Sequence, residues 1–256
     1  MFTRAIVRPP GANFAAGITN AAEGAPDLDK ALAQHLDYCD ALRRCGVAVH
    51  ATPPDDRFPD GTFVEDTAVI CGNMAVITRP GAPTRQAEIE GLAPLLESFA
   101  LSVHAITAPG TLDGGDICQV EEHFLIGLSR RTNVDGGSQL ASILGRHGYS
   151  SSVIDIRDSR ALLHLKSGLA YAGDRRLVAM AGLSLPAQLR GYEVLEAAPD
   201  EIYAANCVRI NDHLLIAAGY PRLRARLDRL GYATIALEMS EFRKMDGGLS
   251  CLSLRL

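Results

Sequence analysis

The chain carries a cysteine among glycines close to its last residue. Cys251 follows "DGGLS", and the sequence stops five residues later. A small apolar residue in a terminal strand would explain it, because most free cysteines are buried and unreactive. A nucleophile would explain it too, since glycines allow a ligand or a neighbouring strand to come close. Cys251 alone does not decide between the two.

Two other residues could complete a site that depends on a cysteine. His164 lies among leucines in "ALLHLKSGLA", where a packed core histidine is the commoner explanation. Asp113 in "TLDGGDI" precedes two glycines, and a tight turn would explain it equally well. A thiol, an imidazole and an orienting carboxylate are the machinery of a cysteine nucleophile. The three residues are therefore more informative together than singly.

An acidic cluster accompanies them. Asp60, Glu65 and Asp66 lie within the segment "FPDGTFVEDT". A solvated acidic turn is one explanation. Several carboxylates without metal-ligand spacing also suit an organic cation, and guanidinium fits best because its planar fork matches carboxylate geometry.

A weak internal repeat indicates how these residues are positioned. Short apolar runs end in Arg-Pro or Gly and lead into helix-like segments. They occupy 5–12, 75–82, 124–133, 177–182 and 214–222. A period of roughly 50 residues favours a radial or stacked architecture. Four of the runs follow another strand across a short turn, which predicts hairpins at Gly72-Asn73, at Glu121-Glu122, near Gly173-Asp174 and at Asn211-Asp212.

The two ends of the chain lack hairpin partners. Strand 5–8 has no preceding strand and strand 250–254 has no following one, so we expect them to pair. The result would be five hairpin-plus-helix units in a ring, with Cys251 beginning the closing strand. Polar residues also precede the inner strands of the other units. They are Asp66, Gly115-Asp116, Lys166-Ser167 and Ala205-Asn206.

Helical patterns follow several of the runs. They predict helices over 26–45, over 84–99 with a break or kink at Pro94, and over a third segment that ends at His147-Gly148. The segment from Gly11 to Gly24 is rich in small residues, with Phe14 and Ile18 as isolated hydrophobes. We expect a mobile loop there, acting as a lid.

Composition limits the class of protein. The 256 residues carry a net charge of −5 and no long basic run, which argues against nucleic acid as a partner. No apolar run resembles a signal peptide or a membrane span, so we expect a cytoplasmic protein with its six cysteines free. No zinc spacing occurs.

Seven motifs in order resemble the dimethylarginine dimethylaminohydrolase (dimethylargininase) family of the guanidine-modifying, or pentein, superfamily. They are "FPDGTFVEDTAVI", "ITRPGAPTRQ", "TLDGGD", "GLSRRTN", "LHLKSG", "AANC" and "KMDGGLSC". The resemblance covers almost the whole chain. It implies the α/β fold of this superfamily, a five-bladed α/β propeller of pseudo-fivefold repeats, and a single catalytic domain over residues 1–256.

The resemblance also implies roles for individual residues. Cys251 is the expected nucleophile, His164 the general acid and base, and Asp113 the acid that supports the histidine, in a position where some members have Glu. The residues expected to bind the substrate are Ile18, Asp60, Phe63, Glu65, Asp66, Arg85, Arg131, Met245 and Asp246. Of these, Arg85 and Arg131 are expected at the amino-acid end of the substrate, and Ile18 in the lid.

The activity that the family implies is hydrolysis of Nω-methylated arginines to citrulline and a methylamine. It would need no metal and no organic cofactor, and its only partner would be the small substrate; a homodimer is left open. A relative that acts on unmodified arginine or another guanidine is the enzymatic alternative. A five-bladed binding module without catalysis is the alternative from another class.

Overall fold

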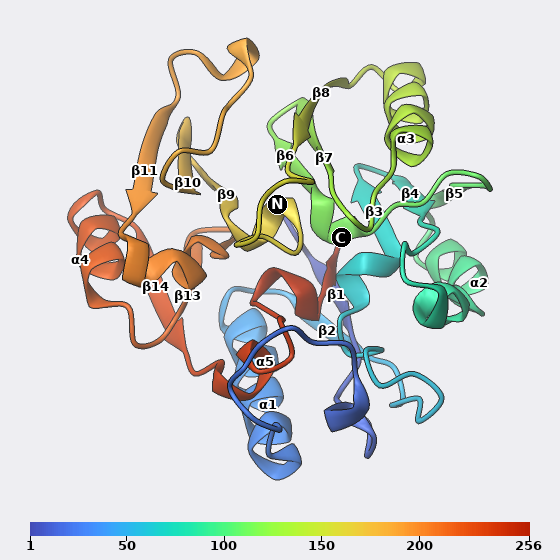
Figure 1. The fold of residues 1–256 in the computed structure, drawn as a ribbon, viewed down its shortest axis with the longest axis horizontal. Coiled ribbons are helices and arrows are strands. Elements are labelled where there is room, and N and C mark those ends of the chain that lie inside the picture. Colours follow the sequence, from blue (N-terminus) through green and yellow to red (C-terminus); the bar gives the residue numbers. More distant parts are fainter. The chain divides into compact units, whose positions relative to one another are not determined.

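The computed structural model describes residues 1–256, and the chain forms two compact units. The first unit consists of Met1–Val64, Gly168–Leu183 and Glu193–Leu256, and the second of Glu65–Ser167 and Ser184–Tyr192. Figure 1 shows the helices and strands of both.

Every sheet is built to one plan. A central strand has an antiparallel neighbour on one side and a parallel neighbour on the other. The first unit holds β15 (Leu254–Arg255), β1 (Arg4–Val7) and β2 (Ala48–Ala51); β9 (Leu169–Gly173), β10 (Arg176–Met180) and β11 (Glu193–Ala197); and β12 (Val208–Ile210), β13 (His213–Ala217) and β14 (Ala233–Leu237). The second unit holds β3 (Ala68–Cys71), β4 (Met74–Ile77) and β5 (Ser102–Ala105); and β6 (Ile117–Val120), β7 (His123–Leu128) and β8 (Ser150–Asp155).

The four predicted hairpins are confirmed. In each of them the antiparallel strands are joined across the expected turn. Turn residues adopt the positive φ that tight hairpins need, with 56° at Gly72 and 52° at Asn211. The turn chemistry of the sequence therefore sets the strand register.

The predicted pairing of the two ends is also confirmed, but the closing strand is shorter than expected. β15 pairs antiparallel with β1, and Leu254 lies opposite Ile6. Cys251 does not begin this strand. It lies in a 3-10 turn over Ser250–Leu252, because its N–H donates back to the carbonyl of Gly248 at 3.2 Å.

The helices follow the sequence patterns with one correction. They are α1 (Leu28–Arg44), α2 (Leu92–Ser98), α3 (Val134–Arg146), α4 (Pro221–Arg229) and α5 (Ser240–Arg243). The segment 84–99 is a 3-10 helix over Pro83–Ile89 followed by α2, and the break falls at Gly91, whose φ is 74°. Pro94 lies in the first turn of α2, where a missing N–H costs little. No helix combines the length and the apolar character needed to cross a membrane.

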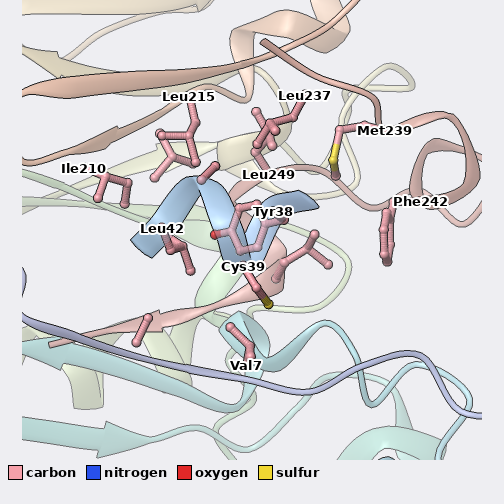
Figure 2. Close-up of a cluster of buried hydrophobic side chains, with 14 of the residues drawn as sticks. Val7, Tyr38, Cys39, Leu42, Ile210, Leu215, Leu237, Met239, Phe242 and Leu249 are labelled. Atoms are coloured by element: carbon pink, nitrogen blue, oxygen red, sulfur yellow. The ribbon is translucent and has the colours of Figure 1, made fainter. Parts of the chain in front are cut away.

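The core of the first unit collects side chains from α1, α5 and the sheets around them (Figure 2). Tyr38 and Leu42 of α1 belong to the same buried cluster as Leu215 of β13, and Phe242 of α5 is fully buried. Phe14 also belongs to this core. The Gly11–Gly24 segment is thus not uniformly loose, because it inserts one aromatic ring into the interior and forms a 3-10 turn over Phe14–Ala16.

Candidate active site

The second unit brings His164 and Asp113 together. Asp113 immediately precedes a 3-10 turn over Gly114–Asp116, and His164 precedes another over Leu165–Ser167. His164 Nε2 lies 2.9 Å from Asp113 Oδ2, and both side chains are buried. Gly115 makes room for the ring, since a Cβ at that position would lie 2.8 Å from His164 Nδ1.

The charge state of this pair follows from its surroundings. Burial disfavours an imidazolium, but the carboxylates of Asp66, Asp116 and Asp113 overcome it and raise the pKa of His164 to about 9. Burial opposes ionisation of Asp113 too, yet the hydrogen bond with His164 keeps its pKa below the usual value. His164 therefore carries a proton at neutral pH, as a general acid must.

Two residues of the second unit, Gly115 and Arg85, hydrogen-bond to the carboxylate of Asp66. Its Oδ1 accepts the N–H of Gly115 at 2.9 Å, and its Oδ2 accepts Nη1 of Arg85 at 2.6 Å. Arg85 is buried and also donates to both carboxylate oxygens of Glu88, at 2.9 and 2.8 Å. The predicted substrate ligand Arg85 thus forms a buried ion-pair network with Asp66 and Glu88.

One buried group has the donor set of a metal site. One ligand atom each of Asp66, Asp113 and His164 lies within 4.8 Å of the others. The guanidinium of Arg85 already supplies positive charge to Asp66, and a protonated His164 offers no lone pair to a metal. The group is therefore better described as an ion-paired cluster, and independence from a metal stays a prediction.

Glu65 and Arg131 complete the predicted residues of this unit. Glu65 Oε1 accepts Nζ of Lys166 at 2.6 Å. Arg131 differs from Arg85, because its Nη1 is buried without a hydrogen-bond partner. An unpaired buried guanidinium nitrogen costs free energy, so it marks a place where an anion would be favourable.

The first unit carries Cys251. Its Sγ accepts the backbone N–H of Gly248 at 3.4 Å, which is the type of donor that stabilises a thiolate. Cys251 is partly exposed, unlike the other five cysteines, which are buried. Gly247 packs against Phe63 so closely that a Cβ would lie 2.2 Å from the ring, so the two glycines of "DGGLSC" let this turn form.

Two of the remaining predicted residues of the first unit, Asp60 and Asp246, hydrogen-bond to the segment 11–24. Both carboxylate oxygens of Asp60 accept the N–H of Ile18, at 3.0 and 3.2 Å. Asp246 accepts the N–H of Asn20 at 2.7 Å. Any lid opening must break these bonds. Phe63 and Met245 are buried in the core of this unit, and the side chain of Ile18 is exposed.

Sequence reasoning missed partners that the structure makes evident. Glu88 and Lys166 neutralise predicted site residues. Asp116 and Asn206 hydrogen-bond next to His164 and Cys251, respectively. The sequence placed both residues just before the inner strand of a repeat, but it predicted no role for either.

Comparison with known proteins shows which family the chain resembles over its length. The family model described as arginine deiminase matches residues 59–189. The chain is 43% identical over 256 residues to N(G),N(G)-dimethylarginine dimethylaminohydrolase of Pseudomonas aeruginosa, covering 100% of both sequences. It is 33% identical to the enzyme of the same name from Streptomyces coelicolor, covering 99% of this chain and 96% of that one.

Solved structures agree with the fold. A cysteine-to-serine mutant of the Pseudomonas aeruginosa enzyme, complexed with citrulline, matches with a TM-score of 0.96 and 42% identity over 100% of both chains. The N-terminal domain of ArgZ, a cyanobacterial arginine dihydrolase, matches with a TM-score of 0.87 at 19% identity, over 100% of this chain and 97% of that one. The fold class is therefore the five-bladed α/β propeller, with the five sheets as its repeats. By full-length similarity, the chain belongs to the dimethylarginine dimethylaminohydrolase family.

Proposed function

We propose that this protein hydrolyses Nω,Nω-dimethyl-L-arginine and Nω-monomethyl-L-arginine to L-citrulline, releasing dimethylamine or methylamine. The observation that carries the proposal is the buried pair of His164 and Asp113 in a chain 43% identical, over its full length, to an enzyme of that name. In this proposal the two units act as one catalytic domain, since His164 and Cys251 serve the same substrate.

The first half of the reaction breaks the bond between carbon and the methylated nitrogen. The thiolate of Cys251, supported by the N–H of Gly248, attacks the central carbon of the guanidinium. The new C–S bond gives a tetrahedral adduct. His164 donates its proton to the methylated nitrogen, the C–N bond breaks, and the amine departs. A thiouronium on Cys251 remains.

The second half returns the enzyme to its starting state. His164, now neutral, accepts a proton from a water molecule that attacks the thiouronium carbon. The C–S bond breaks and the thiolate of Cys251 is restored. The product loses the remaining proton of its new hydroxyl group to solvent and leaves as neutral citrulline. Asp113 holds the ring throughout and stabilises the imidazolium at both ends of the cycle. No step requires a metal or an organic cofactor.

Binding of the amino-acid end of the substrate is assigned to Arg131 and Arg85. The unpaired Nη1 of Arg131 supports its part, because a carboxylate would supply the missing acceptor. Arg85 would have to share its guanidinium with Asp66 and Glu88. Asp60, Asp246 and the backbone near Ile18 and Met245 are the proposed contacts from the first unit.

Recognition of methyl groups requires a site that leaves some nitrogens without acceptors. Methylation removes N–H donors but keeps the charge. We assign Glu65 and Asp66 to the unmethylated nitrogens, and Phe63 and Ile18 to the apolar space. A site built for arginine would place acceptors around every N–H and would lose affinity when methyl groups left them unpaired. The proposed location is the cytoplasm, which suits six free cysteines.

A citrulline assay on a panel of guanidines tests the proposal. Asymmetric dimethylarginine and monomethylarginine should be hydrolysed, with arginine much slower. Cys251→Ser should abolish citrulline formation while leaving the melting temperature close to that of the wild type. If arginine is the best substrate in competition, the enzyme is a deiminase; if nothing is hydrolysed, the chain is a binding protein.

A further inference from the structure

The same hydrogen bond occurs three times between neighbouring repeats. In each case a buried side chain just before an inner strand accepts a backbone N–H from the next repeat. Oδ1 of Asp66 accepts Gly115 N at 2.9 Å, Oδ1 of Asp116 accepts Leu165 N at 3.0 Å, and Oδ1 of Asn206 accepts Ser250 N at 3.0 Å. The partners are 49, 49 and 44 residues apart, close to the repeat length.

The second and third of these bonds fall beside catalytic residues. Leu165 directly follows His164, and Ser250 directly precedes Cys251. Fixing a backbone N–H one residue away restricts where the neighbouring side chain can point. Since a misplacement of about 1 Å can cost about 100-fold in rate, such a bond can be decisive for catalysis.

Both polar atoms of the Asn206 amide hydrogen-bond to Ser250. Oδ1 accepts the N–H of Ser250, and Nδ2 donates to the Ser250 hydroxyl at 3.0 Å. The amide also packs on the backbone of Gly248, where a Cβ would lie 2.6 Å from Oδ1. Gly248 is the residue whose N–H donates to Sγ of Cys251. Asn206 thereby contacts both sides of the turn that presents the thiol.

Asp116 is fully enclosed by donors. One oxygen accepts the N–H of Leu165, and the other accepts the hydroxyls of Ser129 and Thr132, both at 2.6 Å. The side chain is completely buried. Three donors from two segments fix the carboxylate, and the carboxylate in turn fixes the backbone that carries His164.

We propose that Asn206 and Asp116 are positioning residues: one repeated contact between neighbouring repeats holds Cys251 and His164 in their reactive orientations. The inference rests on the proposed function for the roles of these two residues. It extends that function by giving a role to Asn206 of "AANC" and to Asp116, the last residue of "TLDGGD". Neither residue binds the substrate or reacts in the mechanism above.

The test for Asn206 uses a second asparagine of the first unit as its control. Asn206→Ala removes the contact to Ser250. Asn211→Ala is the matched control, because the Asn211 side chain also makes long-range hydrogen bonds, to Phe2 and Cys45. Asn206→Ala should lower kcat about 100-fold with KM changed less than threefold, and should slow alkylation of Cys251 by iodoacetamide about tenfold. Asn211→Ala should lower the melting temperature while kcat stays within about threefold of the wild type.

If Asn206→Ala fails to fold, the conservative variant Asn206→Asp still tests the positioning role. Asn206→Asp retains the acceptor for the N–H of Ser250, and the Ser250 hydroxyl can turn to donate to it. It should recover most of kcat, to within about tenfold of the wild type. Wild-type kcat in a folded Asn206→Ala, or a loss in Asn206→Asp as large as in Asn206→Ala, would overturn the positioning role.

Two variants test Asp116: Asp116→Asn removes the charge but keeps the shape of the side chain, and Asp116→Ala removes both. Asp116→Asn keeps an oxygen for the N–H of Leu165 and can donate its amide to Ser129 and Thr132, so kcat should stay within about tenfold. Its basic pH limit should fall, since one of the charges acting on His164 is gone. Asp116→Ala loses the contact and should lose about 100-fold in kcat. Equal kcat in the two variants would contradict the proposal.

These readouts separate the inference from the proposed function. Alkylation of Cys251, followed by peptide mapping, needs no methylarginine and no turnover. If Cys251→Ser still forms citrulline, the proposed mechanism fails. If the alkylation rate is the same in Asn206→Ala and the wild type, the positioning role of Asn206 fails, whatever the substrate turns out to be.

Discussion

His164 holds its proton because carboxylates from three places in the second unit act on it. Asp113 contributes through a direct hydrogen bond, and Asp66 and Asp116 through charge. In the proposed mechanism the protonated form is the general acid for amine departure, so activity should fall as pH rises through about 9. The pair also fixes the ring through Nε2.

Removing one of those charges should move the basic limit of activity. Asp113→Asn keeps the size of the side chain but loses the ionic hydrogen bond, so the pKa of His164 should fall and the basic limb of the kcat/KM profile should shift to lower pH. Measurement of kcat/KM between pH 6 and 10 checks this. An unmoved limb with unchanged activity would mean that His164 is not the acid.

Arg131 is the residue whose loss should affect binding most selectively. Arg131→Ala removes a charged donor from the substrate carboxylate, so KM should rise about 10- to 100-fold with kcat nearly unchanged. Decarboxylated arginine analogues provide the control, because their turnover should not respond to the substitution. An equal loss for substrates with and without the carboxylate would contradict the assignment.

Arg85 should behave differently, because it neutralises two buried acids. Arg85→Ala leaves Asp66 and Glu88 without their guanidinium, and breaking a buried ion pair on one side costs about 3–5 kcal/mol. Urea unfolding should show that loss of stability. Arg157→Ala, which removes an exposed pair with Asp155, should change stability little. A stable Arg85→Ala with a raised KM would restore a pure binding role.

At the scale of elements, the closing strand β15 is short but well anchored. It pairs with β1, and the carbonyl of Leu256 accepts the N–H groups of both Thr3 and Arg4. Deleting residues 254–256 keeps Cys251 but exposes the edge of β1. The truncated chain should melt well below Cys251→Ser, as scanning calorimetry would show. Equal melting temperatures would mean that this pairing contributes nothing to stability.

Local signals predicted most of the elements, and their failures are also local. Two-residue turns predicted the hairpins because few residues tolerate positive φ. The stop of α1 before Gly46 was predicted, but the helix begins at Leu28 and not at position 26, because Asp27 caps it. The predicted position of the helix break in 84–99 was wrong because a proline acts differently at different positions. It interrupts a helix interior but is tolerated in a first turn, where Pro94 lies. Only the Gly91 conformation distinguishes them.

At the scale of the whole molecule, the repeat explains why the site could be foreseen only in part. The residues proposed as nucleophile, acid and supporting carboxylate were recognisable in their motifs. The resemblance to a family predicted the pairing of Asp113 with His164, but other contacts were not foreseen, because they join positions about one repeat apart, such as Asp116 with Leu165 at a separation of 49 residues. No local pattern encodes that Arg85 will pair with Asp66 or that Lys166 will reach Glu65, 101 residues away.

The buried imidazolium should make the stability of the whole chain depend on pH. The pKa of His164 is about 9 in the folded chain and about 6.5 in an unfolded one, so the folded state binds the proton more tightly. The resulting stabilisation, of the order of 3 kcal/mol, is fully present below pH 6.5 and is lost as pH rises through about 9. His164→Gln cannot titrate, so the stability difference between the wild type and this variant should shrink from pH 6 to pH 9.5. Urea unfolding at both pH values measures it, and a difference independent of pH would show that folding does not raise the pKa of His164.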